Sequence, residues 1–368
     1  MIKKRILIIG GYGNFGSYIS KELATEEDFH IIIAGRTESK CKAYAKKLGH
    51  VKYAVLDIHH DFKKSLHILK PDIVIHTSGP FQGQGYDVAK SCIEYGCHYI
   101  DLADGRDFVS GISQLDSFAK KKQVSVISGA SSVPCLSSAI IDEYIKEFKT
   151  LKTVEYGIAT AQQTNRGLAT TASILSYTGK PFEILESGQS KTVYGWQNMH
   201  FHKYPELGHR ALSNCDIPDL SIFPERYPDL ENLRFYAGTE ISAMHTGLWC
   251  LSWLVRFKIV KSLEPFGKIL LKIAHMFDWL GSSNSAFHMT LTGVDNEGKP
   301  LSKTFYLLAK DGDGPFIPCA PSIILAKRLA RGELNQPGAY SSAGLIDLKS
   351  YIDQIQHLNI QYSITDTV

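Results

Sequence analysis

Residues 6–16 read Ile-Leu-Ile-Ile-Gly-Gly-Tyr-Gly-Asn-Phe-Gly, and this stretch decides the fold. Its first four residues are apolar, which is typical of a strand buried on both faces of a parallel sheet. Glycines 11, 13 and 16 then form a G-x-G-x-x-G pattern that opens a helical pattern at residues 17–24. Because the pattern lies between a buried strand and a helix, it predicts a loop that binds the pyrophosphate of a dinucleotide.

Strand and helix patterns alternate along the rest of the first 128 residues. Apolar runs typical of strands occupy residues 30–34, 52–56, 72–76, 98–102 and 124–128, and helical patterns occupy residues 37–48, 86–95 and 108–121. This alternation is typical of βαβ units. The sequence therefore predicts an α/β fold with a doubly wound parallel Rossmann sheet.

The pattern changes after about residue 150. Strands are expected at residues 153–159 and 191–202, helices at 168–177 and 321–329, a hairpin at 286–309 around Asp295-Asn296-Glu297-Gly298, and alternating residues at 360–364. We expect residues 1–150 to form a nucleotide-binding Rossmann domain and residues 151–319 an α+β substrate or dimerisation domain. The tail at residues 320–368 is expected to be able to pack back on the first domain.

The composition is that of a soluble globular protein, with 44% hydrophobic and 21% charged residues and a net charge of +3. No run of Lys and Arg indicates a nucleic-acid partner. The apolar run after the basic start is too short for a secretory signal, so we expect a cytoplasmic protein.

Seven cysteines without paired spacing argue against a disulfide framework. Cys92, Cys97 and His98 lack a second ligand pair, so no metal site is predicted.

Two apolar segments, at residues 248–255 and 269–280, need an interpretation. Both are shorter than the ~20 residues that span a bilayer, and Lys and Arg residues interrupt the region. We expect helices in the core or at a subunit interface, and hence a homodimer. The alternative is association with a membrane surface or an apolar substrate, because basic residues beside Trp-rich helices are typical of interfacial segments.

The end of the second strand indicates which dinucleotide binds. An NAD enzyme usually carries Asp or Glu there to bind the ribose 2′-hydroxyl. This sequence has Arg36 and Thr37 instead, with Lys40 one turn later. An arginine can pair with a 2′-phosphate and stack on adenine, so the cofactor is predicted to be NADP. The alternative is that Arg36 is a solvated residue at a helix start.

Further cofactor contacts are expected where other strands end. Asp57 closes the third strand and either contacts adenine or caps the next segment, and Thr77-Ser78-Gly79-Pro80-Phe81 follows the fourth. Small residues there leave room for a dinucleotide, and Pro80 restricts the turn. The predicted cofactor-binding residues are Gly11, Tyr12, Gly13, Asn14, Phe15, Gly16, Arg36, Thr37, Lys40, Asp57, Ser78, Gly79, Pro80 and Phe81.

Several of these segments together resemble one family. The segments are Gly-Gly-Tyr-Gly-Asn-Phe-Gly at 10–16, Ala-Gly-Arg at 34–36, Ser-Gly-Pro-Phe at 78–81, Cys-His-Tyr-Ile-Asp-Leu at 97–102, Gly-Ala-Ser-Ser-Val-Pro at 129–134, Asn-Arg-Gly-Leu-Ala-Thr at 165–170 and Gly-Asp-Gly-Pro at 312–315. The sequence resembles saccharopine-dehydrogenase-like oxidoreductases over most of its length. The resemblance implies an NADP-binding Rossmann domain, a second α/β domain and nicotinamide-dependent chemistry.

Hydride transfer also needs a group that moves a proton. Asp101 and Asp104 follow the fifth strand and are candidates for a proton donor or an anchor for a substrate amine, with loop capping as the alternative. Ser131 and Ser132 follow the sixth strand and are candidate substrate contacts. His200, His202 and His209 form a cluster for which solvent exposure is favoured over metal binding.

These observations predict an NADP-dependent oxidoreductase that transfers hydride to or from a small amino-acid-like or apolar metabolite. Two alternatives remain open. One is a non-catalytic NADP-binding redox regulator, which keeps the glycine loop but needs no substrate site. The other is a lipid-associated oxidoreductase-like protein that uses the Trp-rich segments at a membrane surface.

Overall fold

The computed structural model describes residues 3–164 and 167–367 and divides into two compact units. The first unit comprises Met1–Leu136 and Phe316–Ile346, and the second comprises Ser137–Pro315 and Asp347–Val368. The chain therefore leaves the first unit earlier than the expected boundary near residue 150. The chain later returns to the first unit with Phe316–Ile346, and its last segment, from Asp347 onward, belongs to the second unit.

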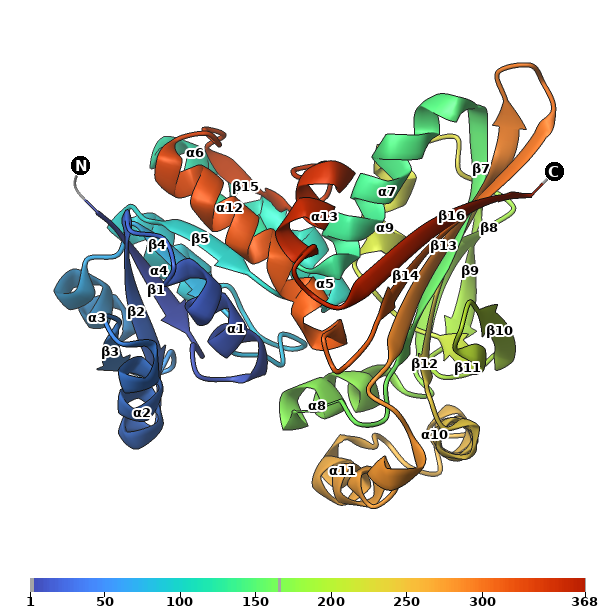
Figure 1. Ribbon diagram of the computed structural model, residues 1–368, viewed down its shortest axis with the longest axis horizontal. Helices are drawn as coiled ribbons and strands as arrows, with labels where there is room; N and C mark the ends of the chain where they lie inside the picture. Colours follow the sequence, from blue (N-terminus) through green and yellow to red (C-terminus); the bar gives the residue numbers. More distant parts are fainter. Residues whose placement is uncertain (1–2, 165–166, 368) are drawn as a thin grey trace. The chain divides into compact units, whose positions relative to one another are not determined.

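The first unit is built on a seven-stranded sheet in the order β15-β6-β5-β4-β1-β2-β3, and every neighbouring pair is parallel. Its strands are β1 (Lys4–Ile9), β2 (Phe29–Gly35), β3 (Lys52–Val55), β4 (Ile73–His76), β5 (His98–Asp101), β6 (Ser125–Ser128) and β15 (Gly338–Ser341). The order reverses at β1, with β4 on one side and β2 on the other. The predicted doubly wound parallel sheet is confirmed (Figure 1).

Helices flank this sheet. They are α1 (Asn14–Leu23), α2 (Glu38–Leu48), α3 (Phe62–Leu69), α4 (Asp87–Tyr95), α5 (Arg106–Ser110), α6 (Asp116–Lys121) and α12 (Ala320–Arg331), with short 3₁₀ and π turns η1 (Gly111–Leu115), η2 (Ser132–Leu136) and η6 (Gly314–Cys319). The prediction of a single helix at residues 108–121 is wrong, since the segment is divided among α5, η1 and α6. A core cluster joins strand residues such as Leu7 and Val74 to Phe62 of α3, Cys92 of α4 and Ala119 of α6.

The second unit is built on a mixed sheet in the order β10-β11-β12-β7-β13-β14-β16, with β8 and β9 attached beside β12. Its strands are β7 (Phe148–Thr160), β8 (Pro181–Glu186), β9 (Gln189–Tyr194), β10 (His200–Tyr204), β11 (Gly208–Asn214), β12 (Asn232–Thr239), β13 (Ser285–Asp295), β14 (Pro300–Ala309) and β16 (Ile360–Thr367). All pairs are antiparallel except β12 with β7. The hairpin expected at 286–309 is confirmed as β13 and β14.

The remaining helices belong to the second unit. They are α7 (Ser137–Tyr144), α8 (Leu168–Tyr177), α9 (Asp219–Arg226), α10 (Ser242–Arg256), α11 (Gly267–His275) and α13 (Leu348–Ile355), with 3₁₀ turns η3 (Ile145–Glu147), η4 (Glu264–Phe266) and η5 (Asp278–Leu280). The single strand expected at residues 191–202 is wrong. It is interrupted between β9 and β10, where Trp196 and Asn198 have positive φ angles of 60° and 59° that a regular strand does not adopt.

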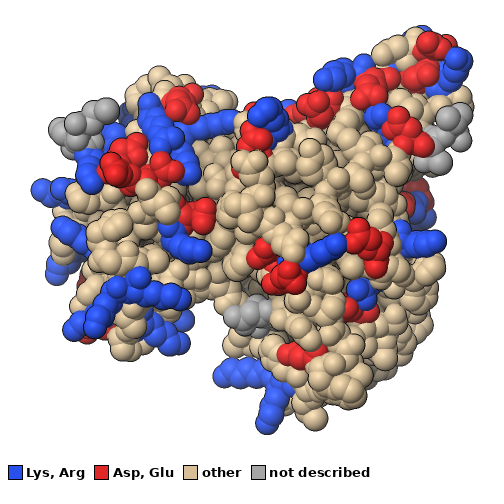
Figure 2. All heavy atoms as spheres, in the orientation of Figure 1, with Lys and Arg blue, Asp and Glu red and all other residues tan. Residues whose placement is uncertain are grey.

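The surface carries charges of both signs, and the face drawn in Figure 2 shows Lys and Arg interspersed with Asp and Glu. No helix within residues 3–164 and 167–367 combines the length and apolar character needed to cross a membrane. Six of the seven cysteines are buried, and all of them are free thiols.

A candidate nucleotide-binding site

The loop between β1 and α1 is packed so closely that it tolerates no side chain at two of its glycines. A Cβ on Gly16 would lie 2.2 Å from the Gly10 carbonyl oxygen, which is far inside van der Waals contact. A Cβ on Gly10 would lie 2.7 Å from the hydroxyls of Thr77 and Ser78, and Gly10 also has a φ of 78°. These glycines therefore let the loop, the first turn of α1 and the end of β4 approach one another.

The same loop presents the N-terminus of α1. Its N-cap residue is Gly13, and the first bond of the helix runs from the Ser17 amide to the Gly13 carbonyl at 2.8 Å. The amides of Asn14, Phe15 and Gly16 precede that bond and have no carbonyl one turn back within the helix. The first turn contains no acidic residue. Amides aligned with the positive end of a helix dipole form a site for an anion such as a pyrophosphate.

The Tyr12 side chain holds the loop against the end of β2. A Cβ on Gly35 would lie 2.3 Å from the Tyr12 ring, so Gly35 leaves the space that this ring occupies. The Tyr12 hydroxyl accepts a hydrogen bond from the Thr37 amide at 3.4 Å. Beside the ring is a pocket of about 310 Å³, which Tyr12, Lys40, Ala43, Tyr44 and Lys47 line. The glycine at 35 is thus required by the position of the Tyr12 ring in the loop.

The edge of this pocket is basic. Arg36 is exposed where β2 ends, and Lys40 and Lys47 lie on the same side of α2 as Tyr44. None of these three cations forms an ion pair with a residue in the described part of the chain. No carboxylate follows β2 before Glu38 in the first turn of α2. Such an edge attracts a phosphate group more strongly than a hydroxyl.

Of the residues that follow β4, Thr77 and Ser78 lie close to the glycine loop, whereas the side chain of Phe81 turns away from it. Thr77 donates its hydroxyl to the Ile9 carbonyl at 2.8 Å, which fastens the end of β4 to β1. Ser78 and Gly79 are half-buried, and the Gly79–Pro80 bond is cis. The ring of Phe81 is 4% exposed and packs on Phe108, so this side chain belongs to the core.

Asp57 makes a local turn. Its Oδ1 accepts a hydrogen bond from the His59 amide at 3.0 Å, and its main chain pairs with His60. This bond from residue i+2 is a local turn of the kind that Asp favours. It is not a cap of the next helix, because the N-cap of α3 is Asp61. The side chain is half-buried, and an adenine contact is still a prediction.

The two candidate catalytic carboxylates differ in environment. Asp101 is fully buried, and its Oδ1 accepts hydrogen bonds from the Gly129 amide (2.9 Å), the Ala103 amide (3.0 Å) and the Ser128 hydroxyl (2.9 Å). Burial raises the pKa of Asp101 to about 6, and the three donors oppose the rise. These contacts connect the ends of β5 and β6. The geometry favours a positioning role for this residue over contact with a substrate.

Asp104 is half-buried, and the Gln82 side-chain amide donates to its Oδ1 at 3.1 Å. The two residues therefore connect the loop after β5 to the loop after β4. Because carboxyl ends of parallel strands share one edge of a sheet, Asp104 lies at the edge where dinucleotide ligands bind in this class of fold. A role in proton transfer stays a prediction for Asp104.

Ser131 and Ser132 are half-buried at the same edge, where β6 ends. The segment before them is held by the tail, because Ser342 donates its hydroxyl to the Gly129 carbonyl at 2.6 Å and Ser322 donates to the Ala130 carbonyl at 2.9 Å. This part of the tail includes α12 and β15. It therefore completes the carboxyl edge of the sheet as well as adding a strand.

Two residues at this edge were not among the sequence-based candidates. Gly10 shapes the loop together with Thr77 of the expected cofactor segment, and His76 of β4 is buried with its Nδ1 3.1 Å from the Tyr99 hydroxyl. Burial lowers the pKa of His76 to about 4, so it is neutral. The doubled glycine at 10–11 was a visible signal for Gly10. The residues lining the pocket on α2 recur three, four and seven positions after Lys40, which is a helical spacing that also could have been found.

The candidate metal ligands do not converge. No group of three or more His, Cys, Asp or Glu side chains within residues 3–164 and 167–367 is arranged to hold a metal ion. The ring of His202 stacks on His288 with centroids 3.7 Å apart, and burial lowers both pKa values, that of His202 to about 4. His209 lies opposite Lys203 and is exposed. Cys92 and Cys97 belong to the core of the first unit.

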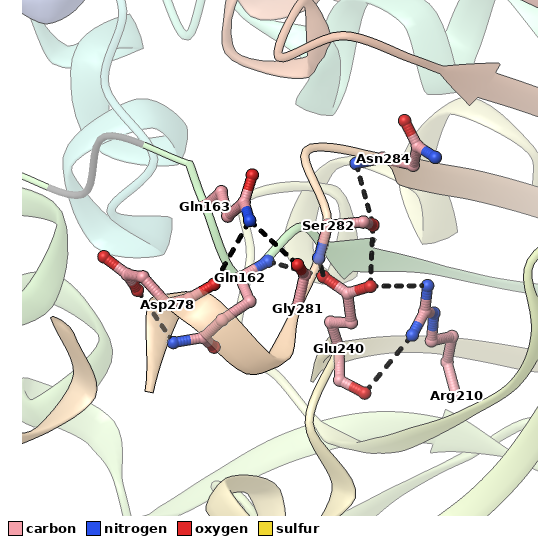
Figure 3. A network of polar contacts seen from close by, with 8 residues as sticks. All are labelled: Gln162, Gln163, Arg210, Glu240, Asp278, Gly281, Ser282 and Asn284. Carbon is pink, nitrogen blue, oxygen red and sulfur yellow. Dashed lines mark hydrogen bonds and ion pairs between the residues drawn. The ribbon is translucent and has the colours of Figure 1, made fainter. Parts of the chain in front are cut away.

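A polar network in the second unit centres on Glu240, just after β12 (Figure 3). Its carboxylate accepts from the Gln162 amide (2.9 Å), from the amide (2.8 Å) and hydroxyl (2.7 Å) of Ser282, and from the Arg210 guanidinium (3.1 Å). These partners hold the pKa of Glu240 below its usual value even though burial opposes them. The network therefore connects the end of β7, β11 and the loop before β13.

Comparison with known proteins agrees with this geometry. Residues 6–127 match the family model described as the saccharopine dehydrogenase NADP binding domain. The match lies within the first unit. A separate comparison with curated proteins gave no match.

The likeness to solved structures extends beyond the NADP binding domain. The apo saccharopine dehydrogenase (L-Glu forming) of Saccharomyces cerevisiae aligns with a TM-score of 0.71 at 14% identity, over 98% of this chain and 100% of that chain. An amine dehydrogenase from Mycobacterium smegmatis aligns with a TM-score of 0.48 at 10% identity, over 93% of this chain and 95% of that one. The yeast likeness shows that both units share the saccharopine dehydrogenase fold. Asn165 and Arg166, part of the resemblance noted above, lie outside the described residues.

Proposed function

We propose that this chain is an NADP-dependent oxidoreductase. The observation that carries the proposal is the basic edge beside the glycine loop, where Arg36, Lys40 and Lys47 stand and no carboxylate closes β2. A ribose 2′-phosphate is a dianion that such an edge attracts, whereas an NAD site usually places Asp or Glu there. The match of residues 6–127 to an NADP binding domain supports the same cofactor.

Each part of the site has its own role in this proposal. The amides at the start of α1 bind the pyrophosphate, and the small residues Ser78 and Gly79 leave room for the cofactor at the end of β4. NADPH, when bound, supplies a hydride for a C=N or C=O carbon of a small amino-acid-like or apolar metabolite. Once hydride adds to that carbon, the electron pair of the double bond would move to the nitrogen or oxygen, which would then take a proton for which Asp104 is the candidate donor. Asp101 holds the ends of β5 and β6 in place for this chemistry.

The cofactor assignment is tested by titrating the protein with NADPH and NADH in parallel, following the fluorescence of the reduced nicotinamide. We expect NADPH to bind more tightly. Arg36→Ala should weaken NADPH about tenfold or more and NADH much less, because a hydrogen bond to a charged group contributes about 1.5–3 kcal/mol. Equal binding of the two dinucleotides by the native protein would contradict the proposal.

The pocket on α2 offers a matched control. Lys40→Ala with Lys47→Ala removes two cations that line the pocket, while Lys42→Ala with Lys46→Ala removes two exposed cations of the same helix that do not. Only the first pair should weaken NADPH binding. Equal losses for both pairs would indicate a diffuse effect of net charge and would remove the pocket from the site.

The burial of Asp101 favours a second candidate function, the non-catalytic NADP-binding regulator. Because Asp101 is fully buried and its Oδ1 accepts from three donors, the loop after β5 offers Asp104 as its remaining candidate acid. The two functions are distinguished by following NADPH oxidation against a panel of imines, keto acids and ketones. Turnover that falls in Asp104→Asn supports the oxidoreductase, and tight NADPH binding without turnover on any of them supports the regulator. The homodimer and the cytoplasmic location also stay predictions.

A further inference from the structure

An exposed apolar surface lies on the segment between α10 and β13. Among the described residues, sixteen large hydrophobic side chains are exposed, and nine of them fall within residues 257–280. Exposed apolar residues are normal when scattered singly, whereas a concentration in one segment indicates a contact surface. The apolar surface, as we name it, consists of Phe257, Ile259, Phe266, Ile269, Ile273, Met276, Phe277, Trp279 and Leu280.

Helix α11 has one side that packs against its neighbours in the second unit and another side that is exposed to solvent. Gly267 faces α8, since a Cβ there would lie 3.6 Å from Leu175, and Leu270 packs on the small core of this region. Ile269, Ile273 and Met276 follow one another by four and three positions and are 60%, 45% and 66% exposed. Because residues at this spacing share one side of a helix, they form a continuous apolar stripe that points into solvent.

The apolar surface is fixed to the body of the second unit. Gln162 donates its side-chain amide to the Ala274 carbonyl (2.9 Å) and to Asp278 Oδ1 (3.0 Å), and Gln163 donates to the Gly281 carbonyl (2.9 Å). Figure 3 shows the bonds from Gln162 to Asp278 and from Gln163 to Gly281, which join the turn after α11 to the Glu240 network. The exposed side chains are therefore presented by an anchored element, which lowers the entropic cost of binding through them.

The surroundings of this surface are basic. Lys258, Lys261, Lys268 and Lys272 are exposed within the same segment, and none forms an ion pair with a residue of the described ranges. The two carboxylates of the segment are both engaged, Glu264 by Lys180 (3.7 Å) and Asp278 by His275 (2.9 Å). In Figure 2, blue side chains adjoin uncharged surface where Figure 1 places α11.

We propose that residues 257–280 form a peripheral membrane-binding surface that docks on a bilayer containing anionic lipids. A short amphipathic element with exposed Ile and Met on one side, and with exposed Trp, Phe and Lys in the same segment, is typical of segments that lie in the headgroup region. The lysines complement the negative surface potential of such a bilayer. The inference does not rest on the proposed oxidoreductase activity.

A second copy of the chain fits this surface less well. In a twofold-symmetric dimer the same patch meets itself, so the four lysines would be brought towards their own equivalents. Lysine is also depleted at protein–protein interfaces, whereas Arg and aromatic residues are enriched. The charge pattern therefore favours an anionic surface over self-association, and self-association becomes one outcome of the test.

The test is flotation of the full chain with vesicles on a density gradient, without nucleotide. One set of vesicles is pure phosphatidylcholine and the other is an equal mixture of phosphatidylcholine and phosphatidylserine. We expect the native protein to float with the anionic vesicles and much less with the neutral ones. Lys268→Gln with Lys272→Gln should lower the affinity for anionic vesicles at least about tenfold, because each lysine near such a surface contributes about 1 kcal/mol.

The apolar side chains are tested by Met276→Ser with Trp279→Ser, which should abolish flotation with both vesicle types. Two exposed residues from other parts of the chain provide the control, Ile68→Ser with Phe201→Ser, which are 68% and 57% exposed. The control should float like the native protein. An unchanged thermal unfolding midpoint shows that each variant is folded.

Three results would overturn the proposal. The first is failure of the native protein to float with anionic vesicles, and the second is an equal loss of flotation in the control and the Met276/Trp279 variant. The third is a dimer in light scattering that the Met276/Trp279 variant dissociates, which would assign the surface to an interface between copies. NADPH titrations on the same samples report on the oxidoreductase proposal separately, so the two ideas can fail independently.

Discussion

Replacing Gly16 by alanine tests whether the close packing of the glycine loop is what makes the anion site. The added Cβ would lie 2.2 Å from the Gly10 carbonyl oxygen and 2.8 Å from the Thr77 hydroxyl. Carbon and oxygen atoms in real structures essentially never approach closer than 3.0 Å in this way. Because the nearer atom belongs to the main chain, the loop and the first turn of α1 must separate by about 1 Å.

Two consequences follow from that separation. Overpacking of this kind costs about 1–3 kcal/mol of folding free energy, so the thermal midpoint should fall measurably. The displaced amides at the start of α1 would also lose their alignment with the pyrophosphate. One such charge-assisted hydrogen bond is worth about 1.5–3 kcal/mol, so we expect the dissociation constant of NADPH to rise about 10- to 100-fold.

The assay is calorimetric titration with NADPH together with thermal unfolding by circular dichroism. Gly247→Ala is the control for the substitution itself, because a Cβ at that position in α10 would meet nothing within 4 Å. That variant should be as stable as the native protein or slightly more so, since alanine favours a helix by about 1 kcal/mol over glycine. Its NADPH affinity should be unchanged.

Gly13→Ala separates binding from folding. Its Cβ would lie 3.1 Å from the Gly10 carbonyl, which requires only a shift of a few tenths of an ångström, and its φ of −75° suits any residue. We expect near-native stability with weakened NADPH binding, because the methyl group would stand where the backbone approaches the pyrophosphate. Native NADPH affinity in Gly16→Ala would refute the reasoning, whatever the unfolding midpoint shows.

Three further predictions concern buried charge and the pocket. Burial raises the pKa of Asp219 to about 7, so its contribution to stability is fully present below its usual pKa and is lost as the pH rises through 7. Urea titrations at several pH values should show that Asp219→Asn removes a decline on the order of 2–4 kcal/mol between acidic and mildly basic solution, and an unchanged decline would exclude this residue as its source. Glu240→Gln should cost about 3–5 kcal/mol by leaving the nearly buried Arg210 unpaired, and a midpoint within error of native would contradict this. Gly35→Ala should displace the Tyr12 ring and weaken NADPH binding, and a crystal structure of the variant with Tyr12 in its native position would rule out that cause.

The first unit was largely predictable from local pattern. A strand buried on both faces reads as an unbroken apolar run, as in residues 6–9, and the glycine positions mark a turn that only small residues permit. The apolar run of β2 likewise shows where that strand ends, and so identifies Arg36 and Thr37 as the residues that follow it. The hairpin of β13 and β14 was likewise visible, because its turn residues and alternation are local properties.

Other features depend on residues that are distant in the sequence. The strand β15 is only four residues long and belongs to the sheet because its main chain pairs with β6, more than two hundred positions earlier. Asp101 looked like a catalytic candidate by position, but its three donors come from the end of β6 and from the residues that follow β5 and β6, which sequence spacing does not bring together. Trp196 and Asn198 interrupt an alternating stretch through main-chain angles that the alternation does not reveal.

The sequence by itself determined that a dinucleotide-binding sheet forms, where its phosphate loop lies and which charges stand beside it, because these depend on short-range periodicity and on the residues permitted in tight turns. Only the tertiary structure decided which polar side chains are buried, which tail segment completes each unit and which apolar residues of 257–280 remain exposed. Burial is a property of what packs against a residue, and the partners of these residues are contributed by distant parts of the chain.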